Sequence, residues 1–208
     1  MKGIEVTVLV LVLSAILSFF IAIFAGLCRL SRFKIVRFIT TFYVEVFRGT
    51  SLIVQLFWLY YALPILFDFQ VGSNLAAGVL AISLNYGAYM SEIVRGAIIS
   101  VDKGQTEASI ALNLSGFQRM RLIIFPQALR MMLPEFGNYL IQMLKATSLV
   151  SLIGMQDILY HGKRFSSSYM SMSATVYILL LVFYFIIAIP LILTSRKMEA
   201  ISKKGVAT

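Results

Sequence analysis

The chain has 208 residues, of which 60% are hydrophobic and only 13% charged, and its mean hydropathy is +0.89. This composition excludes an ordinary soluble domain and predicts an all-α integral membrane protein with a single transmembrane domain over 1–208. Because the basic residues behind the net charge of +9 flank apolar segments, nucleic-acid binding is excluded, and one cysteine with one histidine leaves no metal site.

Five segments are long and apolar enough to cross a bilayer, which takes about 20 residues. In chain order they are 6–27, 50–67, 74–100, 131–153 and 174–193. The first is too long for a signal-peptide core, so we expect it to be retained. The stretch 33–47 is amphipathic and basic, and we expect it to lie along the membrane interface.

Lysine and arginine residues predict the orientation. Fourteen of them lie within 29–48, 95–130 and 196–204, and three lie on the other side, at Lys2, Lys163 and Arg164. The positive-inside rule then places the N-terminus outside and the C-terminus, with Lys204, in the cytoplasm. The long loop 101–130 is therefore predicted to be cytoplasmic.

This loop is polar and favours helix. Gln105 or Thr106 can cap a first short helix, and Glu107 then lies in its first turn, where a carboxylate interacts favourably with the helix dipole. Asn113 tolerates a left-handed backbone and permits a turn. We expect a second short helix over 117–125, closed by Pro126.

The loop reads Glu107-Ala108-Ser109, then Asn113, then Ile123-x-Phe125-Pro126. This pattern resembles the coupling-loop signature of permease subunits of bacterial ABC importers, which is Glu-Ala-Ala, a glycine four residues on, and Ile-x-Leu-Pro. The chain departs from this signature at three positions. Ser109 is small like alanine, Asn113 tolerates a left-handed backbone like glycine, and Phe125 is large and apolar like leucine. Three further segments, 45–56, 89–96 and 145–151, resemble the polar amino acid subgroup, in order and in register with the five spans.

The resemblance implies a subunit with five spans that pairs with a second permease, the same or homologous. A coupling helix would enter a groove of an ABC ATPase subunit, and a periplasmic or lipid-anchored solute-binding protein would deliver the substrate. ATP and Mg²⁺ are implied on the ATPase and no cofactor in this chain, which has no G-x-x-x-x-G-K-[ST] motif. The predicted function is ATP-driven import of amino acids or related polar zwitterions through a bacterial inner membrane, among membrane lipids. The run 55–61 looks most like permeases for ectoine-type solutes, opines or basic amino acids.

On this resemblance the ATPase contact is assigned to the first loop helix and its turn, that is, Glu107, Ala108, Ser109, Asn113 and Leu114. The alternative is that these residues form only a solvated helix.

A substrate path needs polar side chains that face the interior of a bundle. The candidates are Gln55, Trp58, Asn85, Tyr89, Asn138, Gln142, Lys145, Thr147 and Ser148. Each can instead bond one helix to another, Trp58 can belong to an aromatic belt, and Lys145 can snorkel or pair with Glu135.

Charged residues near the cytoplasmic ends of the spans are predicted to form ion pairs that organise the bundle. They are Glu45, Arg48, Glu92 and Arg95. Asp157, in an outer loop, is a candidate contact for a cationic substrate or for the binding protein.

Two other classes of function stay open at this stage. A secondary transporter or channel for small polar solutes would work without an ATPase, but we see no inverted repeats in five spans. A membrane-embedded enzyme acting on lipids would need clustered acids or a nucleophile–base pair, whereas the nine acidic residues are spread singly along the chain. The chain is therefore not expected to be an enzyme.

Overall fold

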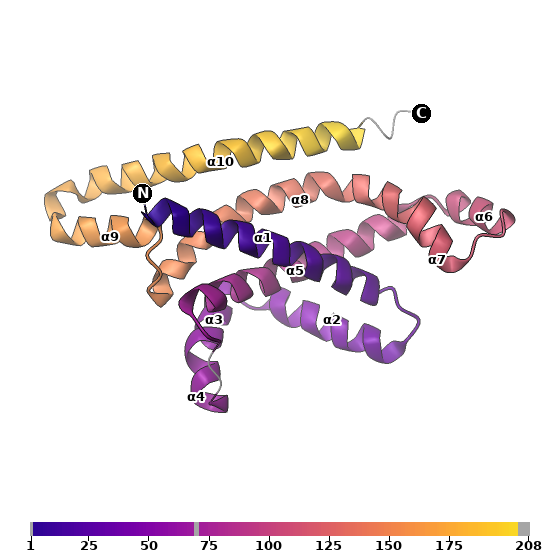
Figure 1. Cartoon of the computed structure of the whole chain (residues 1–208), viewed down its shortest axis with the longest axis horizontal. Coiled ribbons are helices and arrows are strands. Elements are labelled where there is room, and N and C mark those ends of the chain that lie inside the picture. The colour runs from indigo at the N-terminus through magenta and orange to yellow at the C-terminus, as the bar shows by residue number, and fades with distance from the viewer. Residues whose placement is uncertain (1, 69–70, 204–208) are drawn as a thin grey trace.

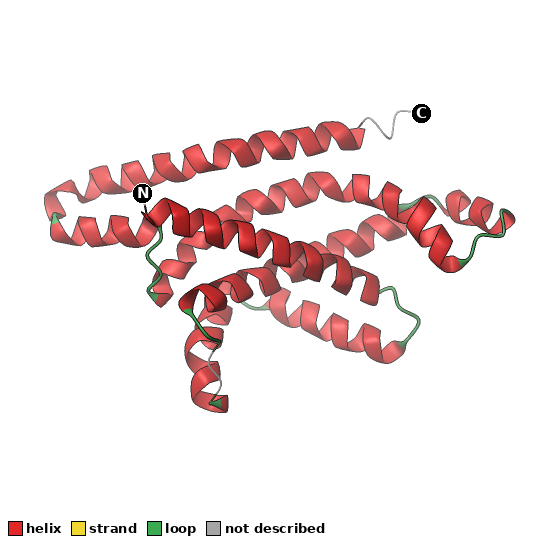
Figure 2. Cartoon of the chain, viewed as in Figure 1, coloured by secondary structure: helices red, strands yellow, loops and turns green. Residues whose placement is uncertain are grey.

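The structure, a computed structural model, describes residues 2–68 and 71–203. Every regular element in this part of the chain is a helix (Figure 2). Lys204, counted above with the cytoplasmic lysines, lies outside the described residues.

The long helices run roughly parallel or antiparallel to one another, and short helices join them (Figure 1). The α-helices are α1 (Lys2–Cys28), α2 (Lys34–Gly49), α3 (Leu52–Phe57), α4 (Leu63–Phe67), α5 (Asn74–Ser100), α6 (Lys103–Ala111), α7 (Gly116–Arg119), α8 (Phe125–Thr147), α9 (Ile158–Ser168) and α10 (Ser173–Lys203). Two π-helical segments, Trp58–Ala62 and Met120–Ile124, and two 3₁₀ segments, Ser148–Ile153 and Met170–Met172, connect them.

The most extensive helix contact joins α1 to α5, and small residues make it possible. On α1 a small residue recurs every fourth position and is buried, at Ser14, Ser18, Ala22 and Gly26. A β-carbon on Gly87 of α5 would lie 2.6 Å from Ile21 Cγ2, so the two backbones approach closely there. In lipid, where apolar side chains gain little by meeting each other, such close packing is a main source of helix association.

Helices α8 and α10 complete the bundle. α8 contacts α1, α5 and α10, and Gly137 lets α8 approach α10 at Ser195, since a β-carbon there would lie 2.8 Å from the Ser195 Cα. One continuous apolar core links α1, α5 and α8 through residues such as Val10, Ile82 and Met132.

The segment 33–67 contains a sharp bend, at the place where an interfacial helix was expected to lead into the second span. α2 packs against α1 and α5 and runs antiparallel to α1 (Figure 1), and the chain then bends by 109° into α3 and α4. Thr50 at the bend is extended, with φ −118° and ψ 155°. The amphipathic pattern that predicted an interfacial helix arises because α2 carries a polar face toward α5, through Tyr43 and Arg48.

Within the described residues, two helices are long and apolar enough to cross a membrane, Lys2–Cys28 and Met170–Ser202. The bent pair Lys34–Gly49 and Leu52–Phe67 makes a third if it is one broken span. α5 and α8, also predicted to cross, are 27 and 23 residues long but carry charged side chains.

Two alanine substitutions on α5 test the close contact with α1. Gly87→Ala forces a β-carbon against Ile21, whereas nothing lies within 4 Å of a β-carbon at Gly96. We expect Gly87→Ala to lower the free energy of unfolding by about 1–3 kcal/mol through overpacking. We expect Gly96→Ala to raise it by about 0.5–1 kcal/mol, since alanine favours helix over glycine. Thermal unfolding of both variants in one detergent measures this, and shifts of the same sign would contradict the close approach.

Candidate functional sites

The end of α2 is held by side chains from α3 and α5. The Gln55 amide donates to the Phe47 carbonyl at 2.8 Å, and the Asn85 amide donates to the same carbonyl at 3.0 Å. The Tyr89 hydroxyl donates to the Arg48 carbonyl at 3.1 Å. The last carbonyls of a helix lack hydrogen-bond partners within that helix, so these three bonds stabilise the bend between α2 and α3.

Gln55 and Asn85 also bond to each other, with the Asn85 amide 3.0 Å from Gln55 Oε1. Both are almost fully buried. Two of the predicted pathway residues therefore act as hydrogen-bonding links between helices, which was the alternative interpretation for them.

One carboxylate gathers three arginines near the far end of α5. Glu92 accepts from Arg48 at 3.1 Å, from Arg95 at 3.0 Å and from Arg29, which follows α1. The pairing of Arg48 and Arg95 with Glu92 was among those predicted, and Arg29 was missed, although it is the first basic residue after the first span. Glu45 was wrongly grouped with them, because it forms no ion pair with any other described residue.

A cavity of about 350 Å³ lies beside the bend between α2 and α3. Its lining combines polar groups with three tyrosine rings and comprises Thr50, Ser51, Leu52, Asn85, Tyr86, Tyr89, Tyr139 and Gln142. The rings of Tyr86 and Tyr139 meet edge to face at 6.0 Å, and the Arg48 guanidinium lies 5.6 Å from the centre of the Tyr89 ring. Three of the predicted pathway residues, Asn85, Tyr89 and Gln142, line this cavity.

Tyr86 and Tyr139 were not among the predicted pathway residues. Tyr86 is one residue from Asn85, and Tyr139 is one residue from Asn138. Aromatic residues in a membrane span are usually interpreted as packing or interfacial groups. Only the structure shows that the two rings meet across α5 and α8.

One face of α8 is polar and exposed. Glu135, Asn138, Gln142 and Lys145 are spaced by three or four residues, so they share this face, and all four are exposed. Lys145 forms no ion pair with Glu135 or with any other described residue. Charged groups at membrane depth are costly when they face lipid, so this face needs water or another protein chain beside it.

The other predicted pathway residues do not reach the cavity. Thr147 is buried and its hydroxyl donates to the Leu144 carbonyl at 2.7 Å. The Ser148 hydroxyl donates to the Lys145 carbonyl at 2.7 Å. Trp58 is half exposed on the π-helical segment after α3.

The first loop helix, α6, begins and ends with well-defined caps. Asp102 is its N-cap and accepts from the Gly104 N–H, in place of the cap predicted at Gln105 or Thr106. At its other end, Asn113 is left-handed with φ 56°. The Leu114 N–H donates to the Ser109 carbonyl at 3.0 Å and the Asn113 N–H to the Ile110 carbonyl at 2.9 Å, the two bonds of a Schellman motif.

The residues assigned to the ATPase contact differ in their exposure to solvent. Glu107 and Ala108 are exposed, as is the turn at Asn113, while Leu114 is half-buried. Ser109 is 2% exposed and its hydroxyl donates to the Thr106 carbonyl. Large apolar side chains also stand exposed here, at Ile110, Leu112 and Phe117. α6 therefore presents both an acidic and an apolar surface.

Pro126 does not close the second loop helix. α7 starts at a capping box between Ser115 and Gln118, and the π-helical segment Met120–Ile124 carries it into α8 without a break. Pro126 is the second residue of α8, directly after the π-helical segment, and the helical run continues through it. The loop is therefore joined rigidly to α8, and Gln127 of α8 also donates to Gln105 of α6 at 3.2 Å.

Asp157 is not available to a substrate or to a binding protein. It is fully buried, accepts from the Tyr160 N–H at 2.9 Å as the N-cap of α9, and lies 3.4 Å from the Tyr184 hydroxyl of α10. Burial raises the pKa of its carboxyl above the ordinary value, and hydrogen bonds to the carboxylate partly oppose this.

Comparisons with known proteins agree with this arrangement. The family described as binding-protein-dependent transport system inner membrane component matches residues 6–200. The chain is 46% identical over 180 residues to "Probable amino-acid ABC transporter permease protein y4tF" of Sinorhizobium fredii, covering 84% of this chain and 75% of the relative. It is 40% identical over 159 residues to "Arginine transport system permease protein ArtQ" of Bacillus subtilis, covering 76% and 72%. A solved "amino acid ABC transporter with histidines" superposes with a TM-score of 0.85 at 31% identity, covering 98% of this chain and 92% of that one.

The turn at Asn113 predicts opposite effects of two substitutions. Asn113→Gly keeps the left-handed conformation without strain, so we expect no loss of loop structure. Asn113→Val forces a β-branched residue into it, and we expect a local destabilisation of more than about 1 kcal/mol. Hydrogen exchange of the α6 amides reports this, and equal protection in the two variants would contradict the left-handed turn.

The buried carboxyl of Asp157 predicts a pH dependence. Its pKa is raised in the folded state, so its contribution to stability is present below the ordinary value of about 4 and is lost as pH rises through the raised pKa. In Asp157→Asn the new amide side chain still caps α9 but does not ionise. We expect the thermal stability of the variant to rise relative to that of the wild type as pH increases above about 4, through the raised pKa of the wild-type carboxyl. Parallel pH profiles would show that Asp157 does not titrate abnormally.

Proposed function

Because the chain belongs to the family of binding-protein-dependent transport system inner membrane components, we propose a specific mode of action for it within an ABC importer. The chain is a permease subunit and not an enzyme, and its family implies ATPase subunits and a solute-binding protein as partners. The finer proposal is a five-span, multi-pass subunit with its N-terminus outside, which pairs with a second permease and imports polar amino acids.

The projection of α6 from one end of the bundle carries this proposal. Helices α6 and α7, residues 103–119, form a knob at one end of the bundle. In Figure 1 this α6–α7 knob lies beyond the ends of α5 and α8, on the side where the α1–α2 turn and the C-terminal end of α10 also lie. These are the three segments predicted to be cytoplasmic from their basic residues, so the arrangement supports that orientation. The N-terminus and α9 lie at the opposite end.

The knob suits insertion into a groove of an ATPase subunit. Glu107 and Ala108 offer a small, acidic surface, and the exposed Ile110, Leu112 and Phe117 offer apolar area. ATP and Mg²⁺ would bind on that subunit. A displacement of the knob passes directly to α8, because α7, the π-helical segment and α8 are continuous from Gly116 to Thr147.

The exposed polar face of α8 supports pairing with a second permease. Two such faces opposite each other would enclose a polar path and remove Glu135 and Lys145 from lipid. Whether the second chain is a copy or a homologue does not affect this argument, since either can supply a polar face.

The cavity beside the bend between α2 and α3 is our proposed point of substrate contact. Its lining contains no charged side chain, and tyrosine faces bind ammonium and guanidinium groups through cation–π attraction. Because Arg48 already lies over the Tyr89 ring, Tyr86 and Tyr139 are the rings that we assign to this contact. Relatives named for arginine and for histidines support an amino acid with a cationic side chain. The volume of about 350 Å³ fits one small molecule.

Reconstitution tests the proposal. The chain, co-expressed with the ATPase subunits and the solute-binding protein of its importer, is placed in liposomes with ATP inside. We expect uptake of arginine or histidine that requires ATP and the binding protein, with competition from glutamine weaker and from ectoine weakest. Uptake that persists without ATP would indicate a secondary transporter or channel instead.

In the same preparation, Glu107→Lys should uncouple the ATPase. Charge reversal at an exposed surface leaves the bundle folded, so we expect intact insertion and a fall in uptake of about tenfold or more, which corresponds to about 1.4 kcal/mol at the contact. Glu5→Lys, the same charge reversal at an exposed position on the first turns of α1, away from the loop, is the control. Unchanged uptake in Glu107→Lys would remove Glu107 from the contact.

A further inference from the structure

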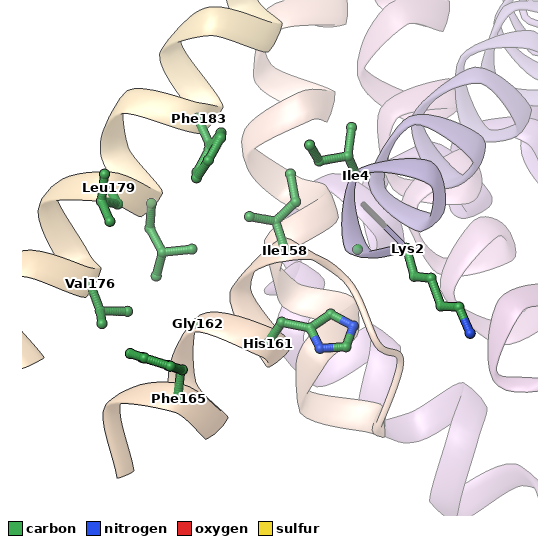
Figure 3. Close-up of a pocket in the computed structure, with 11 residues that line it drawn as sticks. Lys2, Ile4, Ile158, His161, Gly162, Phe165, Val176, Leu179 and Phe183 are labelled. Atoms are coloured by element: carbon green, nitrogen blue, oxygen red, sulfur yellow. The ribbon is translucent and has the colours of Figure 1, made fainter. Parts of the chain in front are cut away.

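Two cavities lie toward the end of the bundle opposite the α6–α7 knob, and their linings differ. The larger, of about 500 Å³, lies between α1, α9 and α10, and Figure 3 shows mainly apolar side chains around it, such as Ile4, Leu179 and Phe183. The smaller, of about 400 Å³, lies where the π-helical segment Trp58–Ala62 and α4 meet the start of α5. We call it the outer cavity, because this end of α5 is the outer one in the proposed orientation.

We propose that the outer cavity is a first binding site for the imported amino acid, which it holds by the cationic side chain before the molecule reaches the cavity beside the bend. The ligand is the one assigned under the proposed function, on which this inference rests. Tyr60 and Tyr61 line one side of the outer cavity, and Ser73 and Asn74 line the other. Among the described residues of its lining none is charged, so ring faces and neutral acceptors have to supply the attraction.

Both cavities lie along one side of α5. Asn74 lines the outer cavity, and Asn85 lines the cavity beside the bend. Eleven residues make three helical turns, so these two positions share a face of α5 and lie about 16 Å apart along it. The segment before α5 flanks both cavities as well, with Thr50 at the inner one and Pro64 at the outer one. A substrate that enters from outside therefore meets the outer cavity first.

The π-helical turn and a proline leave a backbone acceptor at the outer cavity. The Leu63 N–H donates to the Trp58 carbonyl, five residues back, and so does not donate to Leu59. The next residue that could donate to the Leu59 carbonyl in this register is Pro64, which has no N–H. Leu59 therefore lacks a donor within the helix, and it lines the outer cavity. An N–H group of a ligand can supply the missing bond.

The rings of the outer cavity are held in place. The Tyr60 hydroxyl donates to Asn74 Oδ1 at 3.2 Å, and the Asn74 amide donates to the Ile153 carbonyl at 2.8 Å. The Tyr61 ring meets Tyr60 edge to face, with the ring centroids 4.7 Å apart, and is 50% exposed. Tyr61 is therefore the ring more accessible to a ligand. A guanidinium or ammonium group is attracted to a tyrosine face and also carries the N–H donors that the Leu59 carbonyl lacks, whereas a carboxylate or an apolar side chain offers neither.

Cysteine protection tests occupancy in the complex of paired permeases and ATPase subunits, without the binding protein. The complex is placed in phosphatidylglycerol liposomes, which contain no amine headgroup. In a Cys28→Ser background, Ile65→Cys puts a thiol in the lining and Leu66→Cys puts one on α4 outside it. We expect saturating arginine to slow maleimide labelling at position 65 severalfold and to leave position 66 unchanged. Equal rates at position 65 with and without arginine would overturn the proposal.

Two further arms identify the ligand. Citrulline has the shape of arginine with a neutral urea group in place of the guanidinium, so it should protect position 65 much less, and equal protection would refute recognition of the charge. In phosphatidylethanolamine liposomes the lipid supplies an ammonium group. Position 65 should remain reactive there until arginine is added, and protection by the lipid alone would overturn the assignment to an amino acid.

Paired aromatic variants identify the ring. Tyr61→Leu removes a ring from the lining, whereas Phe67→Leu removes an exposed ring of α4 that does not line the cavity. We expect the arginine concentration for half-protection at position 65 to rise about fivefold in Tyr61→Leu and to stay unchanged in Phe67→Leu. Equal shifts in the two variants, or no shift in either, would overturn the role of Tyr61.

Pro64→Ala tests the carbonyl. The new N–H can donate to Leu59, and competition from this bond should weaken arginine protection about tenfold, as expected for one hydrogen bond to a charged group. Pro190→Ala, in α10, is the matched control. Unchanged protection in Pro64→Ala would remove the carbonyl from the site.

Uptake measurements keep this inference apart from the proposed function. An importer that takes up arginine with ATP but shows no protection at position 65 refutes the outer cavity alone. An importer without ATP-driven uptake of a cationic amino acid refutes the proposed function instead.

Discussion

A helix that ends inside a bundle leaves its last carbonyl groups without partners, and in a bilayer water is not there to satisfy them. In α2 the carbonyls of Phe47 and Arg48 are satisfied by Gln55, Asn85 and Tyr89. The bend of 109° depends on these bonds, and the cavity beside it exists only because the chain turns there. Asn85 and Tyr89 also line that cavity. The groups that stabilise the bend therefore also form part of the proposed substrate site.

The Glu92 cluster fixes the same region from the other side. Three arginines on one carboxylate leave an excess of positive charge, and Arg48 lies against the Tyr89 ring that lines the cavity. The carboxylate thus joins the end of α1, the end of α2 and α5 at one point. Removing Glu92 would leave all three arginines without their counter-ion, which is costly away from water.

The sequence predicted the kind of molecule better than the arrangement of its helices. Hydropathy located the apolar segments, and the motif from Glu107 to Pro126 indicated the family that the comparisons show. An interfacial helix over 33–47 before a span at 50–67 implies a bend between them, but the composition of 33–47 does not show that contact with α5 gives its polar face a partner within the chain. Pro126 was misplaced because proline suits both the end of one helix and the first turn of the next. Asp157 was misread because a loop carboxylate gives no sign, in sequence, of being buried as a cap.

Where this protein can move follows from where it is packed. α1, α5 and α8 share one apolar core, and close contacts at Gly26, Gly87 and Gly137 tie the long helices together, so these helices move as one body. α7 is continuous with α8, and Gln127 of α8 donates to Gln105 of α6, so the α6–α7 knob belongs to that body. The exposed polar face of α8 is not packed against any described part of the chain. Alternating access driven through the knob would then change the distance between two such faces, in two paired permeases, while each bundle keeps its internal packing.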